Sequence, residues 1–208
     1  ELSSRRVLFE KNAFAPRSLA SLAKLMTALL AEELIPPGVF VPISAQAIRQ
    51  EGDSGFAAGE KFKKEDLRDF MLAASSNDAA YAFAQFLGEG IGGGQKAAVS
   101  KFVALMNERA RGLNMFRTSF LTPHGLDQFI NNQEISGASG TAYEMALLME
   151  YLYKTHPRIL AGTRQPEIKI VSEEGRELLA ANTNRAARTL PQLIGAKTGF
   201  TELAGGNL

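Results

Sequence analysis

The chain has 208 residues, 45% of them hydrophobic, which is enough for one well-packed core or two small subdomains. Its 23 Lys and Arg residues nearly balance 22 Asp and Glu residues, and this net charge of +1 argues against a nucleic-acid-binding protein. The absence of cysteine excludes disulfide bonds and thiolate metal sites, and two histidines leave little material for a histidine-based metal centre.

No apolar run approaches the roughly 20 residues that are needed to span a bilayer, so no transmembrane segment is predicted in this chain. The first six residues also lack the pattern of a signal peptide.

The amino-terminal part of the chain alternates between short strand-like runs and one strongly apolar helix. Residues 7–9 are predicted to form a strand. Leucine and methionine then recur at helical spacing over residues 19–35, and Pro36 is expected to end this helix. Residues 39–41 are a second strand-like run, followed by a glycine-punctuated loop over residues 52–59.

Helical spacing of apolar residues dominates the middle of the chain. A break at residues 75–77 separates the first two helices there, and Asp78 is the expected N-cap of the second. A glycine cluster at residues 88–94 precedes the third. The predicted helices cover residues 64–74, 79–87, 99–113 and 141–152.

Strand signals return near the carboxyl end. Residues 168–171 and 177–179 flank a Glu-Gly-Arg turn and predict a hairpin, and residues 193–201 read as a strand. We therefore expect an α+β fold, in which strands from the chain ends form an antiparallel sheet with helices packed on it. Residues 1–208 are interpreted as a single domain, and residues 40–160 as an inserted helical subdomain.

The predicted helix over residues 19–35 contains the motif Ser-x-x-Lys. Ser21 and Lys24 are three residues apart and lie on one helix face, so that the amine can reach the hydroxyl. A neighbouring amine is one way to activate a weakly nucleophilic serine. The same spacing is also common on exposed helices that have no catalytic role.

Two further polar motifs follow at a helix break and on a late strand. Ser75 and Asn77 can face the same side of an extended turn, although Ser and Asn are also ordinary turn and cap residues. Lys197 and Thr198 offer a cation and a hydroxyl to a carboxylate, and Gly199 permits an extended peptide to approach the strand. The alternative is an edge strand that a lysine protects.

In this order, Ser-x-x-Lys, Ser-x-Asn and Lys-Thr-Gly resemble the motifs of the serine acyltransferases that penicillin inhibits. The neighbouring residues resemble the D-alanyl-D-alanine carboxypeptidases, which are low-molecular-mass penicillin-binding proteins, in several segments. These segments are residues 20–28, 75–80, 122–127, 182–184 and 195–201. The resemblance implies a β-lactamase/transpeptidase-like fold, and it makes His124 part of a structural turn.

The resemblance also implies the reaction and its catalytic residues. The family removes the terminal D-alanine from peptidoglycan stem peptides. Ser21 would attack the carbonyl between the two D-alanines and form an acyl-enzyme, with Lys24 as the general base. Ser75 would relay the proton toward the leaving amine.

Substrate binding is implied for the remaining motif residues. Asn77 would hold the acyl-side amide, and Lys197 and Thr198 would receive the terminal carboxylate. Gly199 would let the substrate lie close to the strand, and the backbone amides of Phe200 and of the nucleophile would form the oxyanion hole.

No metal or organic cofactor is implied. The expected partners are stem peptides that end in D-Ala-D-Ala, together with β-lactam antibiotics, which would acylate the same serine. The family works outside the bacterial cytoplasmic membrane, so we expect an extracytoplasmic location, in the periplasm or on the outer face of the cytoplasmic membrane.

Three alternatives compete with the carboxypeptidase interpretation. A class A β-lactamase needs a glutamate in a Glu-x-x-Leu-Asn context, which is missing between the second and third motifs. A D,D-endopeptidase uses the same residues, so this alternative stays open. A non-catalytic homologue that binds cell-wall peptide is disfavoured by the complete set of polar motif residues. Its only support is that the chain is expected to lack the start of the family's first strand, its last strands and its closing helix.

Overall fold

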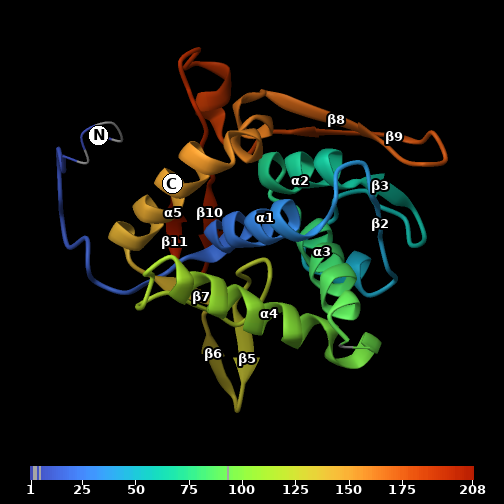
Figure 1. Cartoon of the computed structure of the whole chain (residues 1–208), viewed down its shortest axis with the longest axis horizontal. Coiled ribbons are helices and arrows are strands. Elements are labelled where there is room, and N and C mark those ends of the chain that lie inside the picture. Colours follow the sequence, from blue (N-terminus) through green and yellow to red (C-terminus); the bar gives the residue numbers. More distant parts are fainter. Residues whose placement is uncertain (2–3, 5, 93) are drawn as a thin grey trace.

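The computed structural model describes residues 1, 4, 6–92 and 94–208. Helix α1 (Ala23–Leu34) lies in the centre, and the other long helices pack around it (Figure 1). Burial of α1 follows from its composition, because leucine, methionine and alanine occupy every side of the helix rather than one stripe. The other long helices are α2 (Lys64–Ala73), α3 (Asn77–Gly90), α4 (Gly94–Gly112) and α5 (Ala142–Thr155).

Short 3-10 helices join several of these elements. They are η1 (Ala20–Leu22), η2 (Ala47–Arg49), η3 (Pro157–Leu160), η4 (Gly162–Arg164) and η5 (Arg185–Arg188). None of the helices in the described part of the chain is long and apolar enough to cross a membrane.

All strand pairs among the described residues are antiparallel, and most are hairpins at the edge of the helical core. A three-stranded sheet has the order β1-β7-β4, and the two-stranded sheets are β2·β3, β5·β6, β8·β9 and β10·β11. The strands are β1 (Arg17–Ser18), β2 (Phe40–Pro42), β3 (Lys61–Lys63), β4 (Ser119–Phe120), β5 (Gln128–Ile130), β6 (Gln133–Ile135), β7 (Ala138–Gly140), β8 (Glu167–Val171), β9 (Glu177–Ala181), β10 (Gly199–Thr201) and β11 (Gly205–Asn207). Together with the helices, they confirm the predicted α+β class.

Two expected strands differ in the structure. Residues 7–9 form no strand, and their apolar side chains are exposed, up to 83% at Phe9. The strand predicted over residues 193–201 shortens to β10, because the preceding backbone binds side chains instead of another strand. For example, the Ala196 N–H donates to Thr163 Oγ1 at 3.2 Å.

The two chain ends also do not share a hydrogen-bonded sheet. β1 pairs with β7, and β10 pairs with β11. The two regions meet through packing of β10 against η1 and through one side-chain bond, from Asn207 Nδ2 to Ser18 O at 3.2 Å. β7 pairs with one edge of β1, and in the described part of the chain no strand pairs with the other edge.

Helix α3 begins two residues earlier than expected, at Asn77 instead of residue 79. Its N-cap is Ser76, not Asp78, because the Ser76 Oγ accepts the Ala79 N–H at 3.1 Å. The helix also continues through Gly88. A Cβ there would lie 1.9 Å from Ala98 O, so glycine allows α3 and α4 to approach closely.

Candidate active site

Ser21 lies in η1, directly before the central helix. The preceding residue, Ala20, has a φ of +47°, a left-handed conformation that is unfavourable for a residue with a Cβ. The surrounding contacts hold this turn. Leu19 N–H donates to Ala138 O at 2.8 Å, and a Cβ on Gly125 would lie 1.9 Å from Ala20 O. A strained, closely packed turn therefore presents the half-buried Ser21 side chain.

Lys24 is the partner of this serine. Its Nζ lies 2.7 Å from Ser21 Oγ and donates to His124 O at 3.0 Å. The side chain is completely buried. This burial, together with the charge of Lys197, lowers the pKa of Lys24 well below its usual range. A neutral amine at this position can accept a proton from the hydroxyl.

The turn that contains His124 positions Lys24 through its backbone. Thr27 Oγ1 donates to Pro123 O at 2.6 Å, one turn of α1 beyond Lys24. The His124 ring is buried, and burial lowers its pKa to about 3. Its Nδ1 accepts the Leu126 N–H at 3.1 Å, and its Nε2 lies 3.1 Å from Gln50 Oε1. The neutral ring thus stabilises the turn, while the carbonyl contacts the lysine.

Ser75 and Lys197 form a second serine–lysine pair. Ser75 lies between α2 and α3 with a φ of +61°. Lys197 Nζ donates to Ser75 Oγ at 2.8 Å and to Thr198 O at 2.6 Å. Burial lowers the pKa of Lys197 to about 7. Because the charge of Lys197 also depresses the pKa of Lys24, the two pairs are electrostatic neighbours.

Asn77 is the first residue of α3, and only the nitrogen of its side-chain amide is hydrogen-bonded among the described residues. Its Nδ2 donates to Glu51 O at 2.6 Å, whereas its buried Oδ1 has no hydrogen-bond partner in the described part of the chain. A buried carbonyl oxygen without a partner is costly. Asn77 therefore offers an acceptor to an N–H group of a ligand.

The Lys-Thr-Gly segment lies against the nucleophile turn. Thr198 Oγ1 is 2.6 Å from Thr183 Oγ1, and Thr183 N–H donates to Ala73 O at 2.9 Å. A Cβ on Gly199 would lie 3.1 Å from the Ser21 amide nitrogen. Phe200 follows with 67% of its surface exposed. Glycine at position 199 therefore allows β10 to approach the nucleophile turn closely, in addition to the proposed approach of a substrate peptide.

The sequence motifs missed several groups of this site. The backbone carbonyls of Glu51 and His124 contact motif side chains. Because every residue has such a carbonyl, the sequence does not indicate which ones take part. Thr183 lies within a segment that the resemblance includes, and its hydroxyl contact was not foreseen. No group of His, Asp and Glu residues in the described regions could hold a metal ion.

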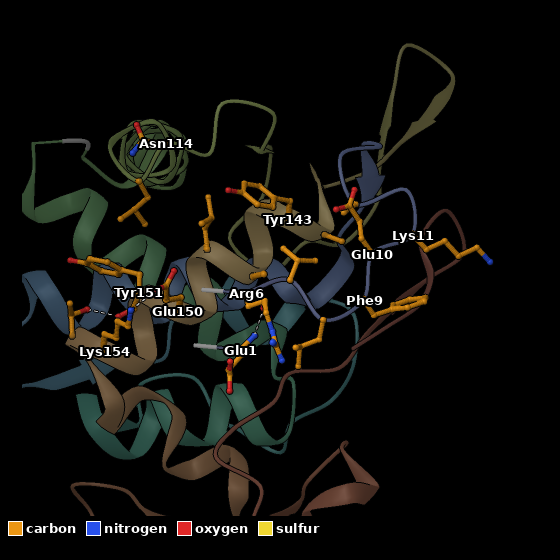
Figure 2. Close-up of a pocket in the computed structure, with 18 of the residues that line it drawn as sticks. Glu1, Arg6, Phe9, Glu10, Lys11, Asn114, Tyr143, Glu150, Tyr151 and Lys154 are labelled. Atoms are coloured by element: carbon orange, nitrogen blue, oxygen red, sulfur yellow. Dashed lines mark hydrogen bonds and ion pairs between the residues drawn. The ribbon is translucent and has the colours of Figure 1, made fainter. Parts of the chain in front are cut away.

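A cavity of about 980 Å³ lies elsewhere on the molecule (Figure 2). It is bounded by the amino-terminal segment and by side chains of α5 that include Tyr143, Tyr151 and Lys154. Its described lining contains none of the predicted site residues. This cavity is therefore separate from the two serine–lysine pairs.

Comparison with known proteins agrees with the geometry. D-alanyl-D-alanine carboxypeptidase DacF of Bacillus subtilis is 30% identical over 207 residues, which cover 97% of this chain and 49% of that protein. A crystal structure of a D-alanyl-D-alanine carboxypeptidase from Mycobacterium tuberculosis matches with a TM-score of 0.82 and 26% identity, over 99% of this chain and 72% of the other. Penicillin-binding protein D2 of Listeria monocytogenes, in its ampicillin-bound form, matches with a TM-score of 0.73 and 29% identity, over 99% and 78%.

The chain spans from about half to two thirds of the length of the curated relatives, with values of 49%, 65% and 52% for three of them. The family model described as D-alanyl-D-alanine carboxypeptidase (peptidase S11) matches residues 1–208. The two serine–lysine pairs, the fold and this full-length match lead to one conclusion: the chain belongs to the D-alanyl-D-alanine carboxypeptidase family.

Proposed function

We propose that this chain is the catalytic domain of a serine-type D-Ala-D-Ala carboxypeptidase that works through an acyl-enzyme on Ser21. The observation that carries the proposal is the 2.7 Å contact between Ser21 Oγ and the fully buried Lys24 Nζ. Burial of the lysine favours the neutral amine that a general base requires. Membership of the family supports the substrate class.

Acylation begins when Ser21 Oγ attacks the carbonyl carbon between the two terminal D-alanines. The hydroxyl proton passes to Lys24 Nζ as the new C–O bond forms. The backbone N–H groups of Ser21 and Phe200 would stabilise the developing oxyanion. The packing of β10 against η1 supports this pairing of the two amides.

The tetrahedral intermediate then collapses, and the C–N bond to the last D-alanine breaks. The leaving nitrogen needs a proton, which Ser75 would relay from the protonated Lys24. Water, activated by the same lysine, hydrolyses the ester, and the shortened peptide leaves with its carboxylate while Ser21 recovers its proton.

The other motif residues would hold the substrate. Asn77 Oδ1, which is buried and has no partner among the described residues, would accept the N–H of the acyl-side amide. Lys197 and Thr198 would bind the terminal carboxylate, with Gly199 allowing a close approach. An incoming anion favours the charged form of Lys197, whose pKa is about 7 in the free site.

The proposal extends to the whole protein. Residues 1–208 would form one catalytic domain, with residues 40–160 as a helical subdomain within it. The enzyme would act on peptidoglycan outside the cytoplasmic membrane, and β-lactams would acylate Ser21. Cleavage of peptide crosslinks by a D,D-endopeptidase would use the same groups.

Intact-protein mass spectrometry with a penicillin tests the proposal. We expect the wild-type chain to gain the mass of one penicillin molecule, and a folded Ser21→Ala variant to gain none. Release of free D-alanine from a pentapeptide, compared with cleavage of a crosslinked dimer, then distinguishes carboxypeptidase from endopeptidase. Folded wild-type protein that gains no mass would overturn the proposed function.

A further inference from the structure

The orientation of the Asn77 side-chain amide depends on a loop that lies outside the catalytic motifs. Residues 51–55, here called the cleft loop, run alongside the start of α3. The cleft loop supplies Glu51 O, which accepts Asn77 Nδ2 at 2.6 Å. With the amide nitrogen bound on that side, the Asn77 Oδ1 is left as the free acceptor.

The far end of the cleft loop is attached to α3 as well. Ser54 Oγ donates to the Ser76 Oγ at 2.8 Å, and Ser54 N–H approaches Asp78 Oδ2 at 3.4 Å. The loop has little regular structure of its own, and its Gly52 and Gly55 have φ values of +88° and +78°. Its conformation therefore depends on contacts from outside the loop.

Arg176 supplies one such contact from a distant part of the chain. It lies in the turn of the β8–β9 hairpin, and its Nη2 donates to Gly55 O at 2.6 Å. The same guanidinium makes a bidentate contact with Glu60, whose carboxylate also accepts the Ala57 N–H at 2.7 Å. One side chain thus fixes both the end of the cleft loop and the residues that follow it.

We propose that Arg176 is a positioning residue for acylation, which acts through the cleft loop on the amide of Asn77. This inference rests on the proposed function, in which Asn77 holds the acyl-side amide of the substrate. Without the guanidinium, Gly55 O loses its donor and the Glu60 carboxylate is no longer held beside Ala57. The loop then samples positions in which Glu51 O no longer orients Asn77.

The structure offers a matched control on the same hairpin. Lys169 Nζ pairs with Glu177 Oε1 at 2.7 Å across β8 and β9, and both side chains are largely exposed. Lys169→Ala therefore removes an ion pair from the hairpin without touching the cleft loop. Comparing it with Arg176→Ala separates the contact with the loop from general weakening of the hairpin.

Two measurements test the inference. Hydrogen exchange followed by mass spectrometry reports on the loop amides directly and does not depend on activity. We expect faster exchange over residues 51–57 in Arg176→Ala than in the wild type, and no change there in Lys169→Ala. Unaltered exchange in Arg176→Ala would overturn the inference.

The second measurement is a double-mutant cycle on the rate of acylation by a penicillin. Arg176→Ala should slow acylation by about 3- to 10-fold in the wild-type background, because imprecise positioning lowers rates. In the Asn77→Ala background, it should slow acylation less than about 2-fold, since the side chain through which it acts is gone. Equal factors in both backgrounds would show that Arg176 does not act through Asn77 and would overturn the inference.

These measurements distinguish a failure of the proposed function from a failure of the inference about Arg176. If penicillin does not acylate the wild-type chain at all, the proposed function fails, and with it the role of Arg176 in acylation. Normal wild-type acylation combined with an unaffected Arg176→Ala rate overturns only the present inference.

Discussion

Gly199→Ala probes the contact between β10 and the nucleophile turn. The new Cβ would lie 3.1 Å from Leu19 O and from the Ser21 amide nitrogen, and 3.3 Å from Ala20 Cβ. These distances are a few tenths of an ångström too short for comfortable packing. Either β10 or the strained turn at Ala20 must therefore move, and both carry amides of the proposed oxyanion hole.

The expected cost in stability is small, whereas the cost in rate is large. Overpacking destabilises by about 1–3 kcal/mol, and replacing glycine by alanine recovers about 0.4–1 kcal/mol through the unfolded state. The free energy of unfolding should thus fall by about 0–2.6 kcal/mol. Loss of one oxyanion donor lowers rates by about 10²- to 10³-fold. Because a small shift weakens the donor without removing it, we expect acylation to slow by about 10- to 100-fold.

Gly206 provides the matched control for this variant. It pairs with Phe200 across the same hairpin, and a Cβ there would meet nothing within 4 Å. Gly206→Ala should leave both the acylation rate and the urea midpoint close to wild type. Acylation rates come from time-resolved intact mass spectrometry, and stabilities come from urea unfolding. A Gly199→Ala variant that acylates as fast as Gly206→Ala would refute the reasoning.

Two electrostatic predictions follow from the buried charges. Burial raises the pKa of Asp78 to about 6, so the folded state holds this proton more tightly than the unfolded state, and stability falls as pH rises from about 4 to 6. Asp78→Asn should remove that fall and increase the free energy of unfolding at pH 7.5 by about 1–2 kcal/mol. Urea unfolding at pH 4 and at pH 7.5 measures this difference. If the variant keeps the pH dependence of the wild type, the prediction is wrong. Lys197→Met removes a charge that lowers the pKa of Lys24, so the rising limb of the pH profile of acylation should move to higher pH. A limb that stays at the wild-type pH would show that Lys24 does not titrate under the influence of Lys197.

Local patterns in the sequence were sufficient to predict most of the helices and one hairpin. The apolar spacing of residues 64–74 and 141–152 corresponds to α2 and α5, and Thr141 caps α5 by accepting the Glu144 N–H at 3.1 Å. The hairpin with Gly175 in its turn is confirmed as β8–β9. These features depend on residues that are close in sequence, so that periodicity and turn residues report them directly.

Strands were harder to predict, because a strand exists only where another backbone pairs with it. The apolar run at residues 7–9 has the composition of a strand but no partner strand among the described residues, whereas the short β1 pairs with β7 more than 100 residues later. The same reasoning explains the shortened strand before Gly199. Its backbone is satisfied by a side chain of η4, which no local pattern reports.

The sequence by itself determined the chemical groups of the site and one of their pairings. Ser21 and Lys24 meet because residues three apart share a helix face, and the order of the three motifs identified the family. Only the tertiary structure decided that Lys197 reaches Ser75, 122 positions away, and that His124 O holds Lys24 from 100 positions away. It also decided the burial that lowers the pKa of both lysines. Burial and backbone contacts arise from the packing of distant segments, and such packing leaves no signature in the residues on either side of a motif.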